Sequence, residues 1–305
     1  MILTAEQERS LASNINASRE LRAVTFSANG EYLLSGGRDQ NVQVWRVQDG
    51  QRVGTIEAKN VLCLAVSKDG KWIAGGTFWG EVFVWDAETY ETVWKHCEDY
   101  NNISAVDFSP DSTKLVSGSW NGPATIRDVA RGEKIRTLQH KEWVTAAKFS
   151  SNGDRIVTAT HGSVQVWNSK DGHLLVDIPV TVSSGYNNGL VWFNNHIFVV
   201  FDNTITQLDA STGSTVSEWP VPDSDVYSCS CIAIPRHGKF IVYSTRRSVT
   251  FWDTSTHMQI GLVEHTEHIR SISLSPGDRS LAIGGEHGTI TIKSQSRPTV
   301  SIVSR

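Results

Sequence analysis

Short runs of alternating apolar and polar residues recur along the chain, and no segment shows the 3.6-residue period of an amphipathic helix. Residues 64–76 read LAVSKDGKWIAGG, which predicts two strands joined by a turn that contains Asp-Gly. A tight polar turn follows, and residues 81–86, EVFVWD, predict a third strand with apolar residues at alternate positions. The pattern therefore predicts an all-β protein.

The same strand–turn–strand–turn–strand unit occurs seven times in the same order. Four of the units have Trp at one position of the third strand, and the residues at this position along the chain are Trp45, Trp85, Arg127, Trp167, Leu208, Trp252 and Lys293. Their successive separations are 40, 42, 40, 41, 44 and 41 residues. Repetition at this period indicates a supersecondary unit that buries its apolar face only against neighbouring units.

Signatures of the forms SPD, SGS and VWD recur in these units, as in FSPDSTKLVSGS at residues 108–119 and VFVWD at residues 82–86. On these residues the chain resembles WD40-repeat proteins, over residues 21–305. The resemblance implies a seven-bladed β-propeller, whose four-stranded antiparallel blades stand radially around a central channel. The unit at residues 190–209, LVWFNNHIFVVFDNTITQLD, is the most divergent.

We expect one domain that spans residues 1–305. The expected repeats are 21–58, 59–98, 99–139, 140–180, 181–221, 222–264 and 265–305, and residues 1–20 are expected to be an N-terminal extension or an edge strand. Residues 299–304 alternate like residues 53–56, which follow the third strand of the first repeat. We therefore expect residues 299–304 to provide the outer strand of the last blade.

The resemblance also implies a hydrogen-bonded set of Asp, His, Ser or Thr, and Trp within each blade, and no repeat here contains all four. The first repeat has Ser35, Asp39 and Trp45 but no His. The fourth has His140, Thr158 and Trp167. Because a buried hydrogen bond contributes only about 0.5–1.5 kcal/mol on balance, packing is expected to compensate for the missing members.

Composition and charge limit the classes of partner. The formal net charge is −4, and the 28 Lys and Arg residues are scattered without forming a run or stripe, which disfavours nucleic acid and anionic membrane surfaces. No stretch approaches the roughly 18 apolar residues of a membrane-spanning helix. The cysteines lie within apolar alternating segments, as buried thiols do in a reducing compartment, and are Cys63, Cys97, Cys229 and Cys231. We expect an intracellular protein, cytoplasmic or nuclear, that is monomeric by itself.

The sequence lacks the common catalytic motifs, since it contains no GxxxxGK[ST], GxSxG or HExxH. The seven predicted first strands read VTF, LAV, VDF, AKF, VWF, IAI and ISL, and Asp107 and Lys148 are their only charged residues. Metal-ligand types gather at the predicted top of the last blade, but their spacing matches no zinc signature, and they are His265, Glu267, His268, Glu286 and His287. We therefore predict no enzymatic activity, no metal and no cofactor.

The resemblance places the turn between the second and third strands on the same face as the loop before the first strand, and partners commonly dock there. The candidate partner-binding residues in these segments are Arg38, Phe78, Trp79, Tyr100, Trp120, Trp143, His161, Arg246 and Arg247. Four of the aromatic residues belong to consecutive repeats, which favours a binding patch. The other interpretation is that they only pack on neighbouring loops. Arg246 and Arg247 suit a phosphate or carboxylate ligand, or are simply solvated.

These observations favour a non-catalytic scaffold or recognition module that binds a protein or peptide partner on the loop face. The alternative is a propeller that binds a small ligand or a carbohydrate, because sugars also stack on exposed Trp. Because one fold supports many functions, these side chains and not the fold indicate the function.

Overall fold

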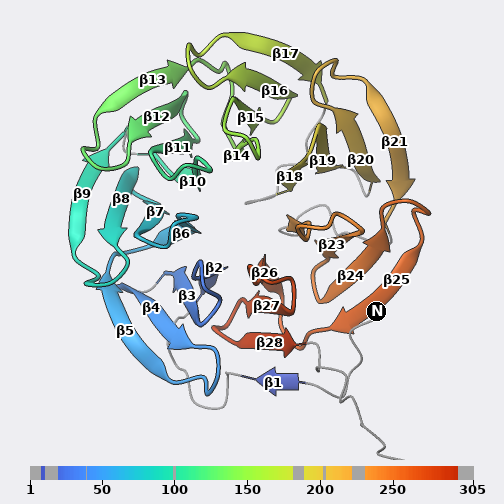
Figure 1. The fold of residues 1–305 in the computed structure, drawn as a ribbon. Helices are drawn as coiled ribbons and strands as arrows, with labels where there is room; N and C mark the ends of the chain where they lie inside the picture. Colours follow the sequence, from blue (N-terminus) through green and yellow to red (C-terminus); the bar gives the residue numbers. More distant parts are fainter. Residues whose placement is uncertain are drawn as a thin grey trace, which may run out of the picture.

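Seven four-stranded antiparallel sheets stand radially around a central axis in the computed structural model (Figure 1). The structure describes residues 8–10, 20–38, 40–98, 101–180, 189–201, 204–221 and 231–294. Each sheet runs outward from a strand near the axis to a strand at the circumference (Figure 1). The expected all-β, seven-bladed propeller is therefore confirmed.

We number the blades 1 to 7 in chain order. Blade 1 contains β2 (Leu21–Phe26), β3 (Tyr32–Gly37), β4 (Asn41–Arg46) and β5 (Arg52–Glu57). Blade 2 contains β6 (Val61–Val66), β7 (Trp72–Thr77), β8 (Glu81–Asp86) and β9 (Thr92–Cys97). Blade 3 contains β10 (Ile103–Phe108), β11 (Lys114–Ser119), β12 (Ala124–Asp128) and β13 (Lys134–Leu138). Blade 4 contains β14 (Ala146–Phe149), β15 (Arg155–Ala159), β16 (Ser163–Asn168) and β17 (Leu174–Pro179).

The remaining blades follow the same order. Blade 5 contains β18 (Leu190–Phe193), β19 (His196–Phe201), β20 (Thr204–Asp209) and β21 (Thr215–Pro220). Blade 6 contains β22 (Ile232–Ala233), β23 (Phe240–Ser244), β24 (Ser248–Asp253) and β25 (Gln259–Glu264). Blade 7 contains β26 (Ile269–Leu274), β27 (Ser280–Gly285) and β28 (Ile290–Ser294), with β1 (Glu8–Ser10) as its fourth strand.

The first strand of the chain closes the ring. β1 pairs antiparallel with β28, with Glu8 opposite Lys293 and Ser10 opposite Thr291. Since β1 precedes blade 1 in sequence but belongs to blade 7, it links the two ends of the propeller and covers an otherwise open strand edge. The outer strand that the sequence predicts at residues 299–304 lies outside the described residues, and β1 takes that position beside β28.

The apolar core fills the spaces between neighbouring blades. At the junction of blades 7 and 1, for example, Leu21 and Trp45 pack in one cluster with Ile290. Small residues in the second strands permit this close approach: a Cβ on Gly76 would lie 2.4 Å from Ile103 Cγ2, and one on Gly284 would lie 2.4 Å from Leu21 Cδ2. The recurring small residues of the sequence pattern are therefore the places where the next blade's first strand packs.

The expected polar links are present where their residues are. In blade 4, Trp167 Nε1 donates to Thr158 Oγ1 at 2.8 Å, and His140 Nε2 lies 2.8 Å from the same hydroxyl. In blade 1, Trp45 Nε1 donates to Ser35 Oγ at 2.9 Å. The two Trp links tie the second strand to the third, and the His140 contact ties the loop before the first strand to the second strand, so each stabilises a single blade.

In blade 3, an ion pair stands at the position of the Trp. Arg127 Nε lies 2.7 Å from Glu98 Oε1, and both side chains are only 8% exposed. Arg127 Nη1 also donates to the carbonyl oxygen of Gly132 at 2.8 Å. Blade 3 therefore replaces an apolar ring by a buried ion pair that reaches back to the end of blade 2.

The cysteines divide into two classes. Cys63 and Cys231 are buried, and burial raises the pKa of the Cys63 thiol to about 12. Cys97 is exposed, so its expected burial is wrong: it lies at the end of β9, an outer strand whose side chains mostly face solvent. Cys229 lies outside the described residues. In the described part of the chain no helix is long and apolar enough to cross a membrane.

Candidate partner-binding face

Backbone hydrogen bonds gather two kinds of segment on one face of the disc. Phe78 N donates to Asn60 O at 2.9 Å, and Trp120 N donates to Asn102 O at 3.0 Å. In each case the turn between the second and third strands is fixed to the loop that precedes the first strand of the same blade. We call the surface formed by these turns and loops the loop face.

Exposed aromatic rings lie on the loop face of blades 2, 3 and 4. Phe78 and Trp79 make an edge-to-face contact with ring centroids 5.1 Å apart, and their exposed fractions are 45% and 57%. Trp120 stacks on Trp143 with centroids 5.6 Å apart and planes 9° from parallel. Trp143 remains 58% exposed, whereas Trp120 is half-buried. We call these four residues the aromatic sector.

The Trp120–Trp143 stack joins two blades. Trp120 follows β11 of blade 3, and Trp143 lies in the loop before β14 of blade 4. Val144 N donates to Ser119 O at 3.0 Å, which fixes the two segments beside each other. Each ring covers one face of the other, and Trp143 still exposes most of its surface to solvent. This pair therefore packs on a neighbouring loop and also remains available to a partner.

The other predicted residues of this region are less informative. His161 is exposed in the turn after β15, and the adjacent Gly162 N donates to Glu142 Oε2 at 2.7 Å. Glu142 precedes Trp143, so this turn also lies beside the aromatic sector. Tyr100 lies outside the described residues.

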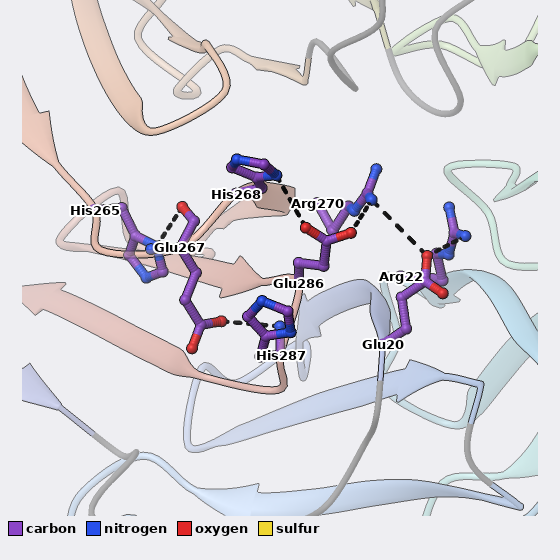
Figure 2. A network of polar contacts seen from close by, with 8 residues as sticks. All are labelled: Glu20, Arg22, His265, Glu267, His268, Arg270, Glu286 and His287. Carbon is purple, nitrogen blue, oxygen red and sulfur yellow. Dashed lines mark hydrogen bonds and ion pairs between the residues drawn. The ribbon is translucent and has the colours of Figure 1, made fainter.

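A charged network occupies the loop face where blades 7 and 1 meet (Figure 2). Glu20 forms ion pairs with Arg22 and with Arg38, and its Oε2 lies 2.8 Å from Arg38 Nε. Arg270 forms an ion pair with Glu286, and its Nη2 lies 3.9 Å from Glu20 Oε1. Arg38 therefore belongs to a network that extends across the junction of two blades.

Two arginines of this network were missed in the sequence. Arg22 lies on β2 and Arg270 on β26, the innermost strands of blades 1 and 7. The expectation that Asp107 and Lys148 are the only charges of the innermost strands is therefore wrong. Both arginines lie two residues before the apolar segment that predicts the strand, at the strand ends that face the loops.

Glu286 is held in its charged form. Burial acts to raise the pKa of Glu286, but the hydrogen bond and charge of Arg270, together with His268, lower it below its ordinary value. His268 Nδ1 lies 2.9 Å from Glu286 Oε2. The network therefore presents carboxylates and guanidinium groups in fixed geometry.

The metal-ligand types of blade 7 are used in local hydrogen bonds. His287 N donates to Glu267 Oε2 at 2.9 Å, and His265 Nδ1 lies 3.1 Å from the carbonyl oxygen of Glu267 (Figure 2). Glu286 binds Arg270 and His268. Within the described ranges, no three His, Cys, Asp or Glu side chains form a group that could hold a metal ion.

Two further residues of the predicted site lie in blade 6, which precedes blade 7. Arg246 and Arg247 are exposed in the turn between β23 and β24 of blade 6. Their carbonyl oxygens accept hydrogen bonds from Ile269 N at 2.8 Å and His265 N at 2.7 Å. The turn of blade 6 is therefore fixed to the loop that leads into blade 7, beside the charged network.

The charges nearer the middle of the innermost strands pair with each other. Lys148 Nζ lies 3.2 Å from Asp107 Oδ1, and Phe149 N donates to Asp107 Oδ2 at 2.8 Å. Asp107 thus links the inner strands of blades 3 and 4, which is a structural use of a carboxylate.

A closed ring of seven antiparallel blades, with fixed turns and loops gathered on one face, defines a propeller of the repeat type. The family model described as "WD domain, G-beta repeat" matches residues 9–46, 50–86, 90–122 and 132–168. The chain belongs to the WD40 repeat family.

Curated relatives match over most or half of the chain. The chain is 24% identical over 285 residues to Autophagy-related protein 16 of Arabidopsis thaliana, covering 88% of this chain and 54% of that protein. It is 22% identical over 309 residues to Eukaryotic translation initiation factor 3 subunit I of Neurospora crassa, covering 90% and 88%. It is 25% identical over 181 residues to the COMPASS component SWD3 of Saccharomyces cerevisiae, covering 56% and 53%. The chain thus spans about half the length of two of these relatives, and two of the names denote parts of a complex.

Proposed function

We propose that the chain is a non-catalytic interaction module that binds a protein or peptide partner on its loop face, with the aromatic sector as the main anchor. The observation that carries this proposal is the Trp120–Trp143 stack, whose outer ring is 58% exposed. Large aromatic rings dominate binding energies because they bury much area and lose little conformational entropy. The names of two relatives, a subunit and a component, are in keeping with this role.

The other proposed properties follow from the same role. An interaction module needs no cofactor, and a net charge of −4 fits a protein partner better than nucleic acid or an anionic membrane. We propose an intracellular location, because buried unpaired thiols such as Cys63 suit a reducing compartment. An enzyme would need reactive groups, whereas Asp107 is engaged by Lys148 and Phe149 N.

The test compares partner capture by the unchanged chain with that of a Trp120→Ala/Trp143→Ala variant. The matched control is Met258→Ala/Leu262→Ala, since these residues are 65% and 51% exposed and lie away from the aromatic sector, in the turn before β25 and on β25. Removing a central aromatic anchor costs about 2 kcal/mol or more, which corresponds to a loss of affinity of about thirtyfold.

Affinity capture with quantitative mass spectrometry identifies candidate proteins, and interferometry with the purified candidate gives the dissociation constants. We expect the tryptophan variant to lose binding while its melting temperature and circular dichroism stay near those of the unchanged chain. Equal binding by the tryptophan variant and the control would refute the aromatic anchor.

A cavity favours the alternative of a small-ligand binder. It has a volume of about 450 Å³ and lies between blades 1 and 2, where the turns after β2, β6 and β8 place it on the face opposite the loop face. Its lining includes the rings of Tyr32 and Tyr90 and the aliphatic side chains of Leu34 and Ile73. This volume is within the range of ligand sites. A thermal-shift screen tests this alternative with the cavity-filling variant Ala28→Trp. Ligands that raise the melting temperature of the unchanged chain but not that of Ala28→Trp would support it.

A further inference from the structure

The Glu20 carboxylate lies among three guanidinium groups, which shows that this part of the loop face accommodates a carboxylate. Arg22, Arg38 and Arg270 come from β2, from the turn after β3 and from β26. Arg22 and Arg270 are mostly buried, so their guanidinium groups are held by the surrounding blades. Arg38 is different, because its side chain is 62% exposed. One face of this network is therefore open to a ligand through Arg38.

The charges of the network are unequal. Within the ion-paired set, Arg22, Arg38 and Arg270 carry three positive charges, while Glu20 and Glu286 carry two negative charges. Glu267, the third carboxylate in Figure 2, binds His287 N and forms no ion pair with this set. The ion-paired set thus has one positive charge in excess before His268 is counted, whereas the whole chain carries a net charge of −4.

The charged network has a further exposed arginine on one side, in blade 6, and the aromatic sector on the other. Arg247 is exposed in the turn of blade 6, and its carbonyl oxygen fixes that turn to the loop before blade 7. Blade 1, which carries Arg38, is followed directly by blade 2, which carries Phe78 and Trp79. A partner segment that crosses the loop face from blade 7 to blade 2 therefore meets arginine first and aromatic rings next.

We infer that Arg38 and its network bind an acidic side chain of the partner. The recognised segment is then a peptide in which a carboxylate lies a few residues from an aromatic side chain, and that side chain packs on the aromatic sector. This inference rests on the proposed function. A carboxylate fits better than a phosphate group, because a single excess positive charge matches a monoanion and the carboxylates of Glu20 and Glu286 repel a dianion. Arginine also offers paired donors that match the two oxygens of a carboxylate.

The experiment selects peptides from a phage-displayed library of random sixteen-residue sequences against the unchanged chain. The same selection is made against Arg38→Gln, against Trp120→Ala/Trp143→Ala, and against the control Arg136→Gln, whose exposed arginine lies on β13 at the circumference. Asp and Glu should be enriched near an aromatic residue in peptides selected by the unchanged chain and by the control. Arg38→Gln should abolish the acidic enrichment alone.

One selected peptide is then synthesised with its acidic residue kept, replaced by Gln, or replaced by phosphoserine, and its binding is measured by fluorescence anisotropy. The acidic peptide should bind about fivefold more tightly than the Gln peptide, as for a solvent-accessible ion pair, and Arg38→Gln should remove this preference. Circular dichroism checks that the exposed substitution leaves the fold intact.

Each outcome has a defined meaning. Absence of acidic enrichment, or its persistence in Arg38→Gln, would overturn the carboxylate site even if aromatic residues are still selected. Acidic enrichment without aromatic enrichment in the peptides selected by the unchanged chain, or aromatic enrichment that persists in Trp120→Ala/Trp143→Ala, would leave the carboxylate site and refute the proposed aromatic anchor. Tighter binding of the phosphoserine peptide would replace carboxylate by phosphate as the ligand, and a failure to select any peptide would overturn both.

Discussion

The buried ion pair of blade 3 gives the sharpest test of the energetics. Glu98→Gln keeps the shape of the side chain but removes its charge, which leaves Arg127 with an uncompensated positive charge at 8% exposure. Removing one partner of a buried pair costs about 3–5 kcal/mol. We expect a value near the lower limit, about 3 kcal/mol, because the amide introduced by Glu98→Gln still offers a carbonyl oxygen to Arg127 Nε.

The expected shift in melting temperature follows from chain length. With about 2 cal/mol/K of unfolding entropy per residue, a chain of 305 residues loses roughly 5 °C for about 3 kcal/mol. Differential scanning calorimetry measures this shift. The control is Glu81→Gln in the neighbouring blade, whose partner Lys95 Nζ lies 3.1 Å away, with exposed fractions of 51% for Lys95 and 27% for Glu81. Such a pair contributes about 0–1 kcal/mol.

A second variant separates charge burial from loss of contact. Arg127→Met combined with Glu98→Leu removes both charges and makes both positions apolar, one of them the position where blades 1, 2, 4 and 6 have Trp. Replacing a whole buried pair by apolar groups is often neutral. We therefore expect the double variant to recover most of the lost stability. A Glu98→Gln shift no larger than that of Glu81→Gln, or a double variant less stable than the single one, would refute the reasoning.

Three further predictions concern the ring and its polar links. Removing residues 1–10 exposes the edge of β28, so amide exchange in residues 290–294 should accelerate in hydrogen-exchange mass spectrometry, and unchanged protection would contradict closure by β1. Thr158→Val removes the acceptor for Trp167 and the partner of His140, and it should cost about 1–3 kcal/mol in thermal unfolding, more than Ser35→Ala, which affects Trp45 alone. Burial lowers the pKa of His140, against the opposing effects of the Leu138 carbonyl and Asp177. The folded state thus favours the neutral ring, and this contribution is present above the ordinary pKa of 6.5 and is lost as the pH falls below it. The melting temperature should therefore drop from pH 7.5 to 5.5 less steeply in His140→Gln than in the unchanged chain.

The blade pattern was predictable because each repeat encodes its strands locally. Alternating residues, Asp-Gly turns and a Trp or its substitute at intervals of 40 to 44 residues all report on short segments. β1 is different: its three residues, Glu-Arg-Ser, carry no apolar alternation, and their pairing with β28 depends on backbone hydrogen bonds across almost the whole chain. The edge of β28 is open until β1 pairs with it, and no local sequence pattern predicts this pairing.

The candidate site was predictable in part for a related reason. Position in the repeat identified the turns that carry Trp120 and Arg38, but the contacts of both side chains cross blade boundaries. The stack of Trp120 on Trp143 and the approach of Arg38 to Glu20 depend on how two blades pack. Arg22 and Arg270 were missed because an arginine at a strand end interrupts no pattern, and only the junction of blades 7 and 1 brings the two together.

Both proposed anchors lie at junctions between blades, and this placement has a consequence for binding. The stacked rings are held by blades 3 and 4, and Arg270 and Arg38 are held by blades 7 and 1. Side chains fixed in this way lose little freedom when a ligand binds, so more of the contact energy appears as affinity. A segment that contacts both junctions also binds the closed ring more tightly than an opened one. It should therefore raise the melting temperature of the unchanged chain, and the chain that lacks residues 1–10 should bind it less tightly.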